Sequence, residues 1–390
     1  SAATPQPPSR DVTALWAKRP AGMYDFVTVG YSGSRPVFTR HRVTNKDALS
    51  KVVTNSYANG SWDAKAYALG DTYDSFLWGA SAIKASTVWP STTGSSVIVA
   101  VVDTGVAVHD DLSPQVLPGY DFVDNDSTPT DLNGHGTHVA SSAAGTQYGI
   151  AKNATLVPVR ILDCTGSGSY SGVIAGLDWI LSPQNLNSKT QAVLNLSIGG
   201  PASSSLNTAI QRLTNAGVNV VVAAGNENSD ACTRSPASAP SAITVGATGI
   251  ADTKASFSNY GPCVDIHAPG VSITGAWFGS PTATNTINGT SMATPHVTGA
   301  VAVYLGLQPT ASVAQVTQYI DSESTKDAIT GLPAATVNKL LYVSPTDGRA
   351  PIVAPVVAMK SVTKITHQSA DVLIDVNPGN APTMLSFEYS

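Results

Sequence analysis

The chain has 390 residues, of which 42% are hydrophobic and 12% are charged, and its formal net charge is −5. This length exceeds one typical domain and allows a large core, whereas the few charges and the lack of a long basic run argue against nucleic-acid binding. No apolar stretch approaches the roughly 18 residues that a membrane span needs.

The first 70 residues form a separate region by composition. Residues 1–22 open with the Pro-rich stretch SAATPQPPSR, and we expect them to be disordered. The pattern that follows predicts two strands, a helix and a further strand: Tyr24–Gly30, Val37–Val43, a helix behind Asn45, and a strand near Trp62–Leu69. We therefore expect residues 1–70 to be a small α+β region ahead of the main domain.

Residues 71–343 alternate short apolar runs with helical stretches, which predicts an α/β fold: a mostly parallel central sheet with helices on both faces. Runs such as VIVAVV lack polar alternation, as strands buried on both faces should. The predicted strands are Val97–Val102, Thr155–Leu162, Ala192–Leu196, Val218–Ala223 and Ile243–Ala247. The predicted helices are Ser171–Ile180, Ser204–Ala216, Ser291–Leu307 and Val313–Ser322.

The C-terminal residues change composition again. Residues 344–357, SPTDGRAPIVAPVV, predict a Pro-rich linker. Residues 358–390 alternate with period two and contain an NPGN turn. They resemble the opening strands of a fibronectin type III-like β-sandwich, cut off after three of about seven strands. We therefore expect a fragment of a longer, multi-module protein and assign no binding function to this piece.

Three segments of the main domain carry residues suited to acyl transfer. Asp103 ends the apolar strand in VIVAVVDTGV, His135 lies between two glycines in NGHGTHVA, and Ser291 opens a helix in NGTSMATPHVTGA. A serine hydroxyl is a poor nucleophile until an imidazole takes its proton, and a buried carboxylate must hold that imidazole in the correct tautomer. The three residues together predict a serine hydrolase.

The same chemistry needs donors for the oxyanion that develops on the substrate. The backbone N–H groups at the start of the Ser291 helix can supply one. Asn226 follows the buried strand in VNVVVAAGNEN, and its side-chain amide can supply a second. His296 lies on the Ser291 helix, where we interpret it as a packing residue rather than a second base.

Five motifs in this order, DTGV, HGTHVA, NLSIGG, AAGN and GTSMATPHV, resemble the subtilase family of serine peptidases from about Asp71 to Val343. SFSNYG, VDIHAPG and RILDCTGSGSYSGVIAGLDW look closest to its proteinase K and aqualysin group. The resemblance implies a subtilisin-like fold and a serine endopeptidase. It also suggests that residues 1–70 are an inhibitory prosegment of a zymogen; a retained N-terminal appendage is the competing interpretation.

The resemblance also implies where an extended peptide substrate binds. Two Gly-rich segments match the family's substrate-binding strands, with Tyr170 near the pocket for the fourth side chain before the cut, and a third segment matches one wall of the primary specificity pocket. The residues are Gly166, Ser167, Gly168, Tyr170, Ser197, Ile198, Gly199, Ala223, Ala224 and Gly225. Small wall residues favour large apolar or aromatic side chains. Arg234 near the pocket floor leaves this preference open, since a guanidinium there favours acidic side chains unless it faces solvent.

Structural calcium is a further expectation from the family. The matching site combines the Asp265 carboxylate with the backbone carbonyls of Pro240 and Ala242, a set of hard oxygen ligands that suits calcium rather than zinc. A second candidate is the acidic loop YDFVDNDSTPTDLNG, and a solvated acidic loop is its alternative interpretation. Its carboxylates are Asp121, Asp124, Asp126 and Asp131.

Three cysteines leave one unpaired in a monomer. The aqualysin-like resemblance implies a disulfide between Cys232 and Cys263. Those relatives join a cysteine at the position of Cys164 to another at the place that Leu132 holds here. We therefore expect Cys164 to be an unpaired, half-buried thiol.

These features lead to a hypothesis about function and two alternatives to weigh. A chain rich in Ser, Thr, Gly and Asn that begins at Ser1, without an initiator Met or a signal sequence, fits an exported hydrolase whose signal is removed or omitted. We expect a secreted, monomeric serine endopeptidase with broad protein or peptide substrates and its own N-terminal segment as inhibitor. An adhesive or scaffolding surface protein with a latent or silent protease domain is the alternative, and a processing peptidase with one dedicated substrate is another.

Overall fold

The computed structural model describes residues 77–344, apart from residues 114, 183, 184 and 186–190, together with the backbone of five strands outside that range. By its contacts the chain divides into two compact units, Ser1–Asp71 and Thr72–Ser390. No helix of the described residues is both long and apolar enough to cross a membrane.

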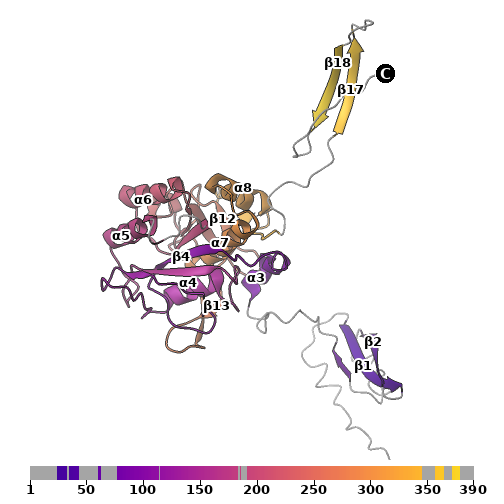
Figure 1. Ribbon diagram of the computed structural model, residues 1–390, viewed down its shortest axis with the longest axis horizontal. Coiled ribbons are helices and arrows are strands. Elements are labelled where there is room, and N and C mark those ends of the chain that lie inside the picture. Colours follow the sequence, from indigo (N-terminus) through magenta and orange to yellow (C-terminus); the bar gives the residue numbers. More distant parts are fainter. Residues whose placement is uncertain are drawn as a thin grey trace, which may run out of the picture. The chain divides into compact units, whose positions relative to one another are not determined.

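A nine-stranded sheet forms the centre of the second unit, in the order β15-β16-β12-β11-β9-β7-β4-β6-β5 (Figure 1). Every neighbouring pair is parallel except β15 with β16. The strands are β4 (Val97–Asp103), β5 (Tyr120–Asp121), β6 (Thr155–Arg160), β7 (Gln191–Leu196), β9 (Asn219–Ala223), β11 (Ile243–Thr248), β12 (Ile266–Pro269), β15 (Thr325–Lys326) and β16 (Lys339–Leu340). The predicted, mostly parallel sheet is confirmed.

Helices cover both faces of this sheet, as predicted. Alternate residues of β4 join two separate hydrophobic clusters: Val97, Val99 and Val101 in one, Ile98, Ala100 and Val102 in the other. The first cluster includes residues of α4 (His135–Ala144) and α7 (Thr290–Leu307), and the second includes residues of α5 (Tyr170–Leu181) and α6 (Ser204–Asn215). Because every residue of β4 is buried, the sequence of this strand shows no polar alternation.

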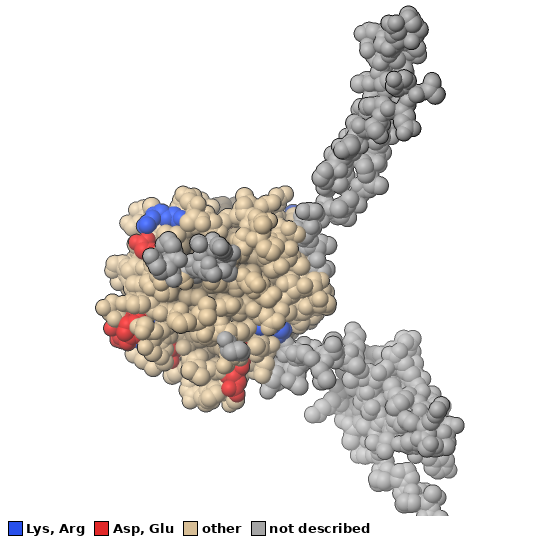
Figure 2. Space-filling model, viewed as in Figure 1, with Lys and Arg blue, Asp and Glu red and all other residues tan. Residues whose placement is uncertain are grey.

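Four further helices and two small sheets surround the central sheet. They are α3 (Trp78–Ala82), the 3₁₀ helices η1 (Ala85–Thr87) and η2 (Ala231–Thr233), and α8 (Val313–Glu323), with β8 (Gly200–Pro201) paired to β10 (Arg234–Ser235) and β13 (Ile273–Ala276) paired to β14 (Thr284–Ile287). Figure 2 shows that Lys, Arg, Asp and Glu side chains are sparse on one face, in keeping with the low charge of the chain.

The position of β4 determines where a site can form. Its neighbours are β6 on one side and β7 on the other, so strands that follow β4 in the chain lie on both sides of it. In open parallel sheets, ligands bind beyond the carboxyl ends of the strands at such a switch point. Asp103 is the last residue of β4 and therefore lies at this place.

The terminal regions are described only as strands. In the first unit, β1 (Tyr24–Ser32), β2 (Arg35–Val43) and β3 (Gly60–Trp62) form an antiparallel sheet in the order β2-β1-β3. This confirms the first two predicted strands, and β3 overlaps the third only at Trp62. Near the C-terminus, β17 (Val356–Thr363) pairs with β18 (Asp371–Asn377) in antiparallel register. The expected disorder at 1–22, the helix behind Asn45, most of the linker and a third β-sandwich strand lie outside the described residues.

Candidate active site

Asp103 and His135 form a hydrogen-bonded pair at the carboxyl end of β4. Asp103 Oδ1 lies 2.7 Å from His135 Nδ1, and the Asp103 side chain is fully buried whereas 26% of the His135 side chain is exposed. The backbone N–H of Thr104 donates to the same Asp103 oxygen over 2.7 Å. A carboxylate that accepts from Nδ1–H leaves Nε2 as the imidazole's acceptor, which is the tautomer of a general base.

The electrostatic surroundings favour protonation of His135. Burial lowers the pKa of this imidazole, but the charge of Asp103, the hydrogen bond to it and the charge of Asp131 together raise the pKa above its ordinary value. His296 differs, because burial lowers its pKa to about 4 and its Nδ1 lies 2.8 Å from the Met292 carbonyl oxygen. The interpretation of His296 as a packing residue agrees with this burial.

Ser291 lies one residue inside the N-terminus of α7. Its Oγ donates to the Ser197 carbonyl oxygen over 3.2 Å, and no hydrogen bond among the described residues joins it to His135. A hydrogen bond from the serine hydroxyl to the imidazole is therefore not formed in this structure. Such hydrogen bonds are often long or unmade without substrate and form in the complex.

Asn226 lies directly beside the N-terminus of the same helix. Its Oδ1 accepts from the Thr290 N–H over 2.9 Å and from the Thr290 hydroxyl over 2.8 Å. This pair of bonds fixes the amide so that its NH₂ group points away from Thr290 and can donate to a ligand. Gly225 makes this turn possible, since it has φ +100° and a Cβ there would lie 2.3 Å from Asn259 Nδ2.

A cavity of about 480 Å³ adjoins the Asp103–His135 pair. It is lined by His135 and by seven of the predicted substrate-binding residues: Gly166, Ser167, Gly168, Tyr170, Ser197, Ile198 and Gly199. Thr104, Asn133 and Thr165 also line it. They were not assigned to the site from the sequence, and their only signal was a position beside residues that were. Ala223, Ala224 and Gly225 do not line this cavity, and the two alanine side chains are buried.

The Arg234 guanidinium lies close to this cavity. Arg234 begins β10, which pairs with β8 directly after Gly199, and its charge acts on Tyr170, whose pKa is raised by burial and lowered in part by Arg234. The Arg234 Nε is buried without a hydrogen bond and lies 3.9 Å from Glu227 Oε2. A carboxylate of the same chain therefore faces the guanidinium.

Two carboxylates of the acidic loop pair with one arginine. Asp121 and Asp124 both bind the Arg160 guanidinium, at 2.5 and 2.6 Å. The described residues contain no group of three or more His, Cys, Asp or Glu side chains placed to hold a metal ion. The solvated-loop interpretation is wrong for Asp121, which is buried, and agrees with Asp124, whose side chain is 60% exposed; the metal interpretation stays a prediction.

Asp131, the last acid of that loop, supports His135 instead. It is 2% exposed, and its two carboxylate oxygens accept five hydrogen bonds of 2.6–2.9 Å. The donors are Thr104 Oγ1, the backbone N–H groups of Asn133, Gly134 and Thr137, and Thr137 Oγ1. Three of these are N–H groups around the start of α4, which has no cap from its own N-cap residue, Gly134. The buried carboxylate thereby ties the residue after Asp103 to the helix that begins at His135.

Asp265 fits a cation by its chemistry. Its Oδ2 accepts the Thr244 N–H over 2.8 Å. Burial raises the pKa of Asp265, and the opposed effects of Lys339 and Asp321 do not reverse this. Asp265 is exposed and Lys339 compensates its charge only in part, so a hard cation would stabilise this carboxylate. Pro240 and Ala242 are near it in the fold through Thr244. The calcium site stays a prediction.

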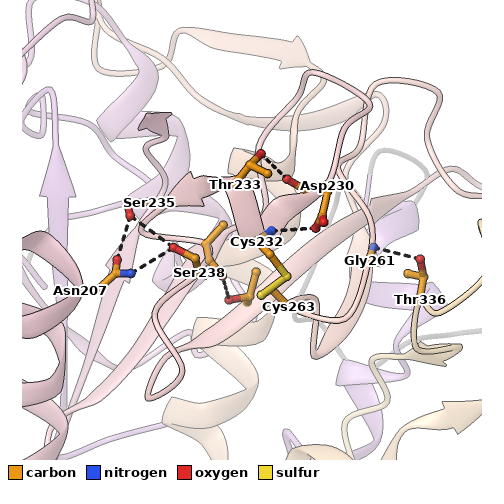
Figure 3. Close-up of a disulfide and its surroundings, with 11 residues drawn as sticks. Asn207, Asp230, Cys232, Thr233, Ser235, Ser238, Gly261, Cys263 and Thr336 are labelled. Carbon is orange, nitrogen blue, oxygen red and sulfur yellow. Dashed lines mark hydrogen bonds between the residues drawn. A yellow bond between two sulfur atoms is a disulfide. The ribbon is translucent and has the colours of Figure 1, made fainter. Parts of the chain in front are cut away.

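The disulfide lies in the segment between Asn226 and Asp265 (Figure 3). Cys232 and Cys263 are bonded with their Cα atoms 5.3 Å apart, which confirms the pairing. Cys164 is unpaired as expected, but it is exposed, so the prediction of a half-buried thiol was wrong. Its carbonyl accepts from Asn133 Nδ2 over 3.0 Å, which places the residue on the surface turn that leads to Gly166.

Comparison with known proteins gives consistent results. The family model described as "Subtilase family" matches residues 94–338. An extracellular serine proteinase of Thermus sp. (strain Rt41A) is 53% identical over 251 residues, which are 64% of this chain and 60% of that protein. Alkaline serine exoprotease A of Vibrio alginolyticus is 47% identical over 250 residues, which are 64% of this chain and 46% of that protein. The chain thus spans less than two thirds of the length of these relatives.

A solved structure shows the same fold. The crystal structure of a cold adapted subtilisin-like serine proteinase superimposes with a TM-score of 0.62 and 45% sequence identity. The match covers 65% of this chain and 91% of the other. The described sheet and helices therefore have the arrangement of a subtilisin-like α/β domain.

Proposed function

Because the chain belongs to the subtilase family, we propose that it is a secreted serine endopeptidase that hydrolyses peptide bonds through an acyl-enzyme on Ser291. The observation that carries this proposal is the 2.7 Å bond from His135 to the fully buried Asp103, beside a cavity and the helix that bears Ser291. Secretion is supported by the name of the Thermus relative, an extracellular proteinase.

The proposed reaction follows from the residues at the site. Ser291 Oγ attacks the substrate carbonyl carbon while His135 Nε2 takes its proton, and Asp103 stabilises the imidazolium that forms. Asn226 Nδ2 and the Ser291 N–H donate to the oxyanion. His135 then gives the proton to the leaving amine as the C–N bond breaks, and the acyl group stays bound to Ser291 Oγ. In the second half-reaction water attacks this ester while His135 takes its proton, and the bond to Ser291 Oγ breaks to release the acid.

A broad substrate range is supported by the way the cavity is lined. Two segments rich in Gly and Ser, Gly166–Gly168 and Ser197–Gly199, flank it. Such edges hold an extended peptide by main-chain hydrogen bonds that depend little on side chains.

Casein digestion tests the proposal. An active protease produces fragments, and a serine-directed inhibitor abolishes them, whereas a silent scaffold protein leaves casein intact with or without the inhibitor.

We propose that Glu227 offsets the charge of Arg234, so that the enzyme prefers an aromatic over an acidic residue before the scissile bond. The wild type should cleave a Phe peptide at least about tenfold faster, by kcat/KM, than the matched Glu peptide. Glu227→Gln frees the guanidinium and should narrow this ratio about threefold or more, because one charge pair near a surface is worth roughly 1 kcal/mol. Asp178→Asn, which breaks a pair with Arg212 elsewhere, is the control. An unchanged ratio in Glu227→Gln would contradict the proposal.

Replacement of Asn226 tests the oxyanion donor. Asn226→Ala should lower kcat about 100- to 1,000-fold with little change in KM, because the amide donates only as charge develops in the transition state. Asn226→Asp is the matched variant, since it keeps an oxygen for the two Thr290 donors and replaces the NH₂ group by a charged oxygen that cannot donate. Wild-type kcat in both variants would show that the oxyanion is stabilised elsewhere.

We propose calcium at Asp265 with the carbonyls of Pro240 and Ala242. An ion bound only by the native state at about 100 times its Kd adds about 2.7 kcal/mol to the free energy of unfolding. A chelator should therefore lower the Tm by about 5–10 °C. Asp265→Ala should melt at the lower temperature with or without calcium, and Asp126→Asn, in the exposed acidic loop, should respond as the wild type does. A Tm that changes neither with the chelator nor in Asp265→Ala would rule the site out.

A further inference from the structure

A proline interrupts the hydrogen bonding of the helix that carries the nucleophile. In an α-helix each carbonyl accepts the N–H four residues later, and the residue four after Ser291 is Pro295, which has no N–H. The Ser291 carbonyl therefore lacks the usual donor from its own helix. Pro295 and its neighbours in α7 are buried, and a buried carbonyl requires a donor from somewhere.

Ser197 supplies that donor from the neighbouring strand. Its Oγ donates to the Ser291 carbonyl oxygen over 3.0 Å, and Ser197 is only 3% exposed. Ser197 follows the last residue of β7 directly and lies 94 positions before Ser291. The same residue accepts the Ser291 hydroxyl on its own carbonyl over 3.2 Å. The backbone carbonyl and the side-chain hydroxyl of Ser291 thus both bond to Ser197, which lies in the segment that lines the cavity.

Two further buried side chains determine which way the Ser197 proton points. Thr298 Oγ1 lies 2.8 Å from Asn195 Oδ1 and 3.2 Å from the Thr294 carbonyl, and Asn195 Nδ2 donates to Ser197 Oγ over 2.8 Å. Thr298 and Asn195 are fully buried. Because Ser197 Oγ already accepts from Asn195, its own proton is available for the Ser291 carbonyl. If the Asn195 amide were reversed, its oxygen would face Ser197 Oγ and accept the Ser197 proton. The Ser291 carbonyl would then have no donor.

We propose that Ser197, oriented by Asn195 and Thr298, is a positioning residue that replaces the helix hydrogen bond lost at Pro295 and so holds Ser291 in its reactive place. This inference rests on the proposed peptidase function. It assigns Ser197 a side-chain role separate from the main-chain contacts that its segment offers to a substrate. Reactions at an enzyme site are sensitive to such placement, since a shift of about 1 Å can cost about 100-fold in rate.

The first test is a pair of substitutions in the chain of hydrogen bonds. Ser197→Ala should lower kcat about 10- to 100-fold and change KM less than about twofold, because the backbone contacts to substrate remain. Thr298→Val should lower kcat to a lesser degree, and the double variant should equal Ser197→Ala alone, since both act through one carbonyl. Thr294→Val is the matched control: it is equally buried on α7, and its hydroxyl bonds only the Thr290 carbonyl.

The second test restores the missing donor. Pro295→Ala gives the helix an N–H four residues after Ser291, so adding it to Ser197→Ala should recover at least about tenfold of the lost kcat. A purely structural role for the Ser197 hydroxyl would show as a lower Tm without this recovery. Thr298→Val, which keeps its shape, serves if Ser197→Ala fails to fold.

The possible outcomes separate the two proposals. An inactive wild type would overturn the peptidase function and this inference with it. An active wild type whose Ser197→Ala variant stays within about threefold in kcat overturns the positioning role alone. Additive effects of Ser197→Ala and Thr298→Val, or no recovery with Pro295→Ala, also overturn it.

Discussion

Ser291→Ala should lower kcat about 10⁶-fold, because no other group can form the acyl-enzyme and the remaining triad members act as a unit with it. The residual rate over water, about 10³- to 10⁴-fold, should come from the oxyanion donors and substrate binding. The backbone carbonyl of residue 291 keeps its bond from Ser197 Oγ, since that bond does not involve the lost hydroxyl. The variant should therefore melt within a few degrees of the wild type.

The measurement is kcat on a chromogenic peptide, together with Tm by circular dichroism. Ser113→Ala, at an exposed serine outside the cavity, is the control and should behave as the wild type. A Ser291→Ala variant that folds and keeps more than about a tenth of the wild-type kcat would show that another residue is the nucleophile.

Asp103→Asn should lower kcat about 10⁴-fold with the fold retained. Its neutral amide cannot stabilise the imidazolium, and in the buried site an NH₂ group would replace Oδ2, which has no hydrogen-bond partner. The pH profile should also move. Catalysis needs neutral His135, so activity falls as the pH falls through the pKa of His135. Asp103 raises that pKa, so its removal should shift the acidic limb of kcat/KM to lower pH.

The control for this prediction is Asp230→Asn, at an exposed acid that accepts the Cys232 N–H away from His135. It should leave both kcat and the acidic limb unchanged. An Asp103→Asn enzyme with an unshifted acidic limb, or with a loss below about 100-fold, would contradict the role of Asp103.

The sequence allowed good prediction of the strands and of where Asp103 and Ser291 lie in the fold, because both depend on local pattern. VIVAVV is apolar throughout, and a strand with no polar face can only be buried on both sides. Asp103 then lies at a strand end and Ser291 at a helix start. The cysteine pairing came from resemblance to the family rather than from local pattern.

The parts that could not be predicted depend on partners far away in the chain. Helix α4, which begins at His135, was not predicted, because its first N–H groups donate to the side chains of Asn133, Thr104 and Asp131 rather than to a residue at the N-cap position. The sequence does not indicate that Arg160 of β6 pairs with Asp121 and Asp124 of the acidic loop. The role of Ser197 beside Pro295 is visible only once β7 and α7 lie together.

Active-site labelling tests the central claim most directly, namely that Ser291 is a nucleophile activated by His135. The chain is incubated with a fluorophosphonate, which reacts with activated serine hydroxyls, and the adduct is located by mass spectrometry of its peptides. The account predicts one adduct, on Ser291, at a rate that falls at least about 1,000-fold in His135→Ala. An adduct on another serine, or labelling of Ser291 at the same rate without His135, would contradict it.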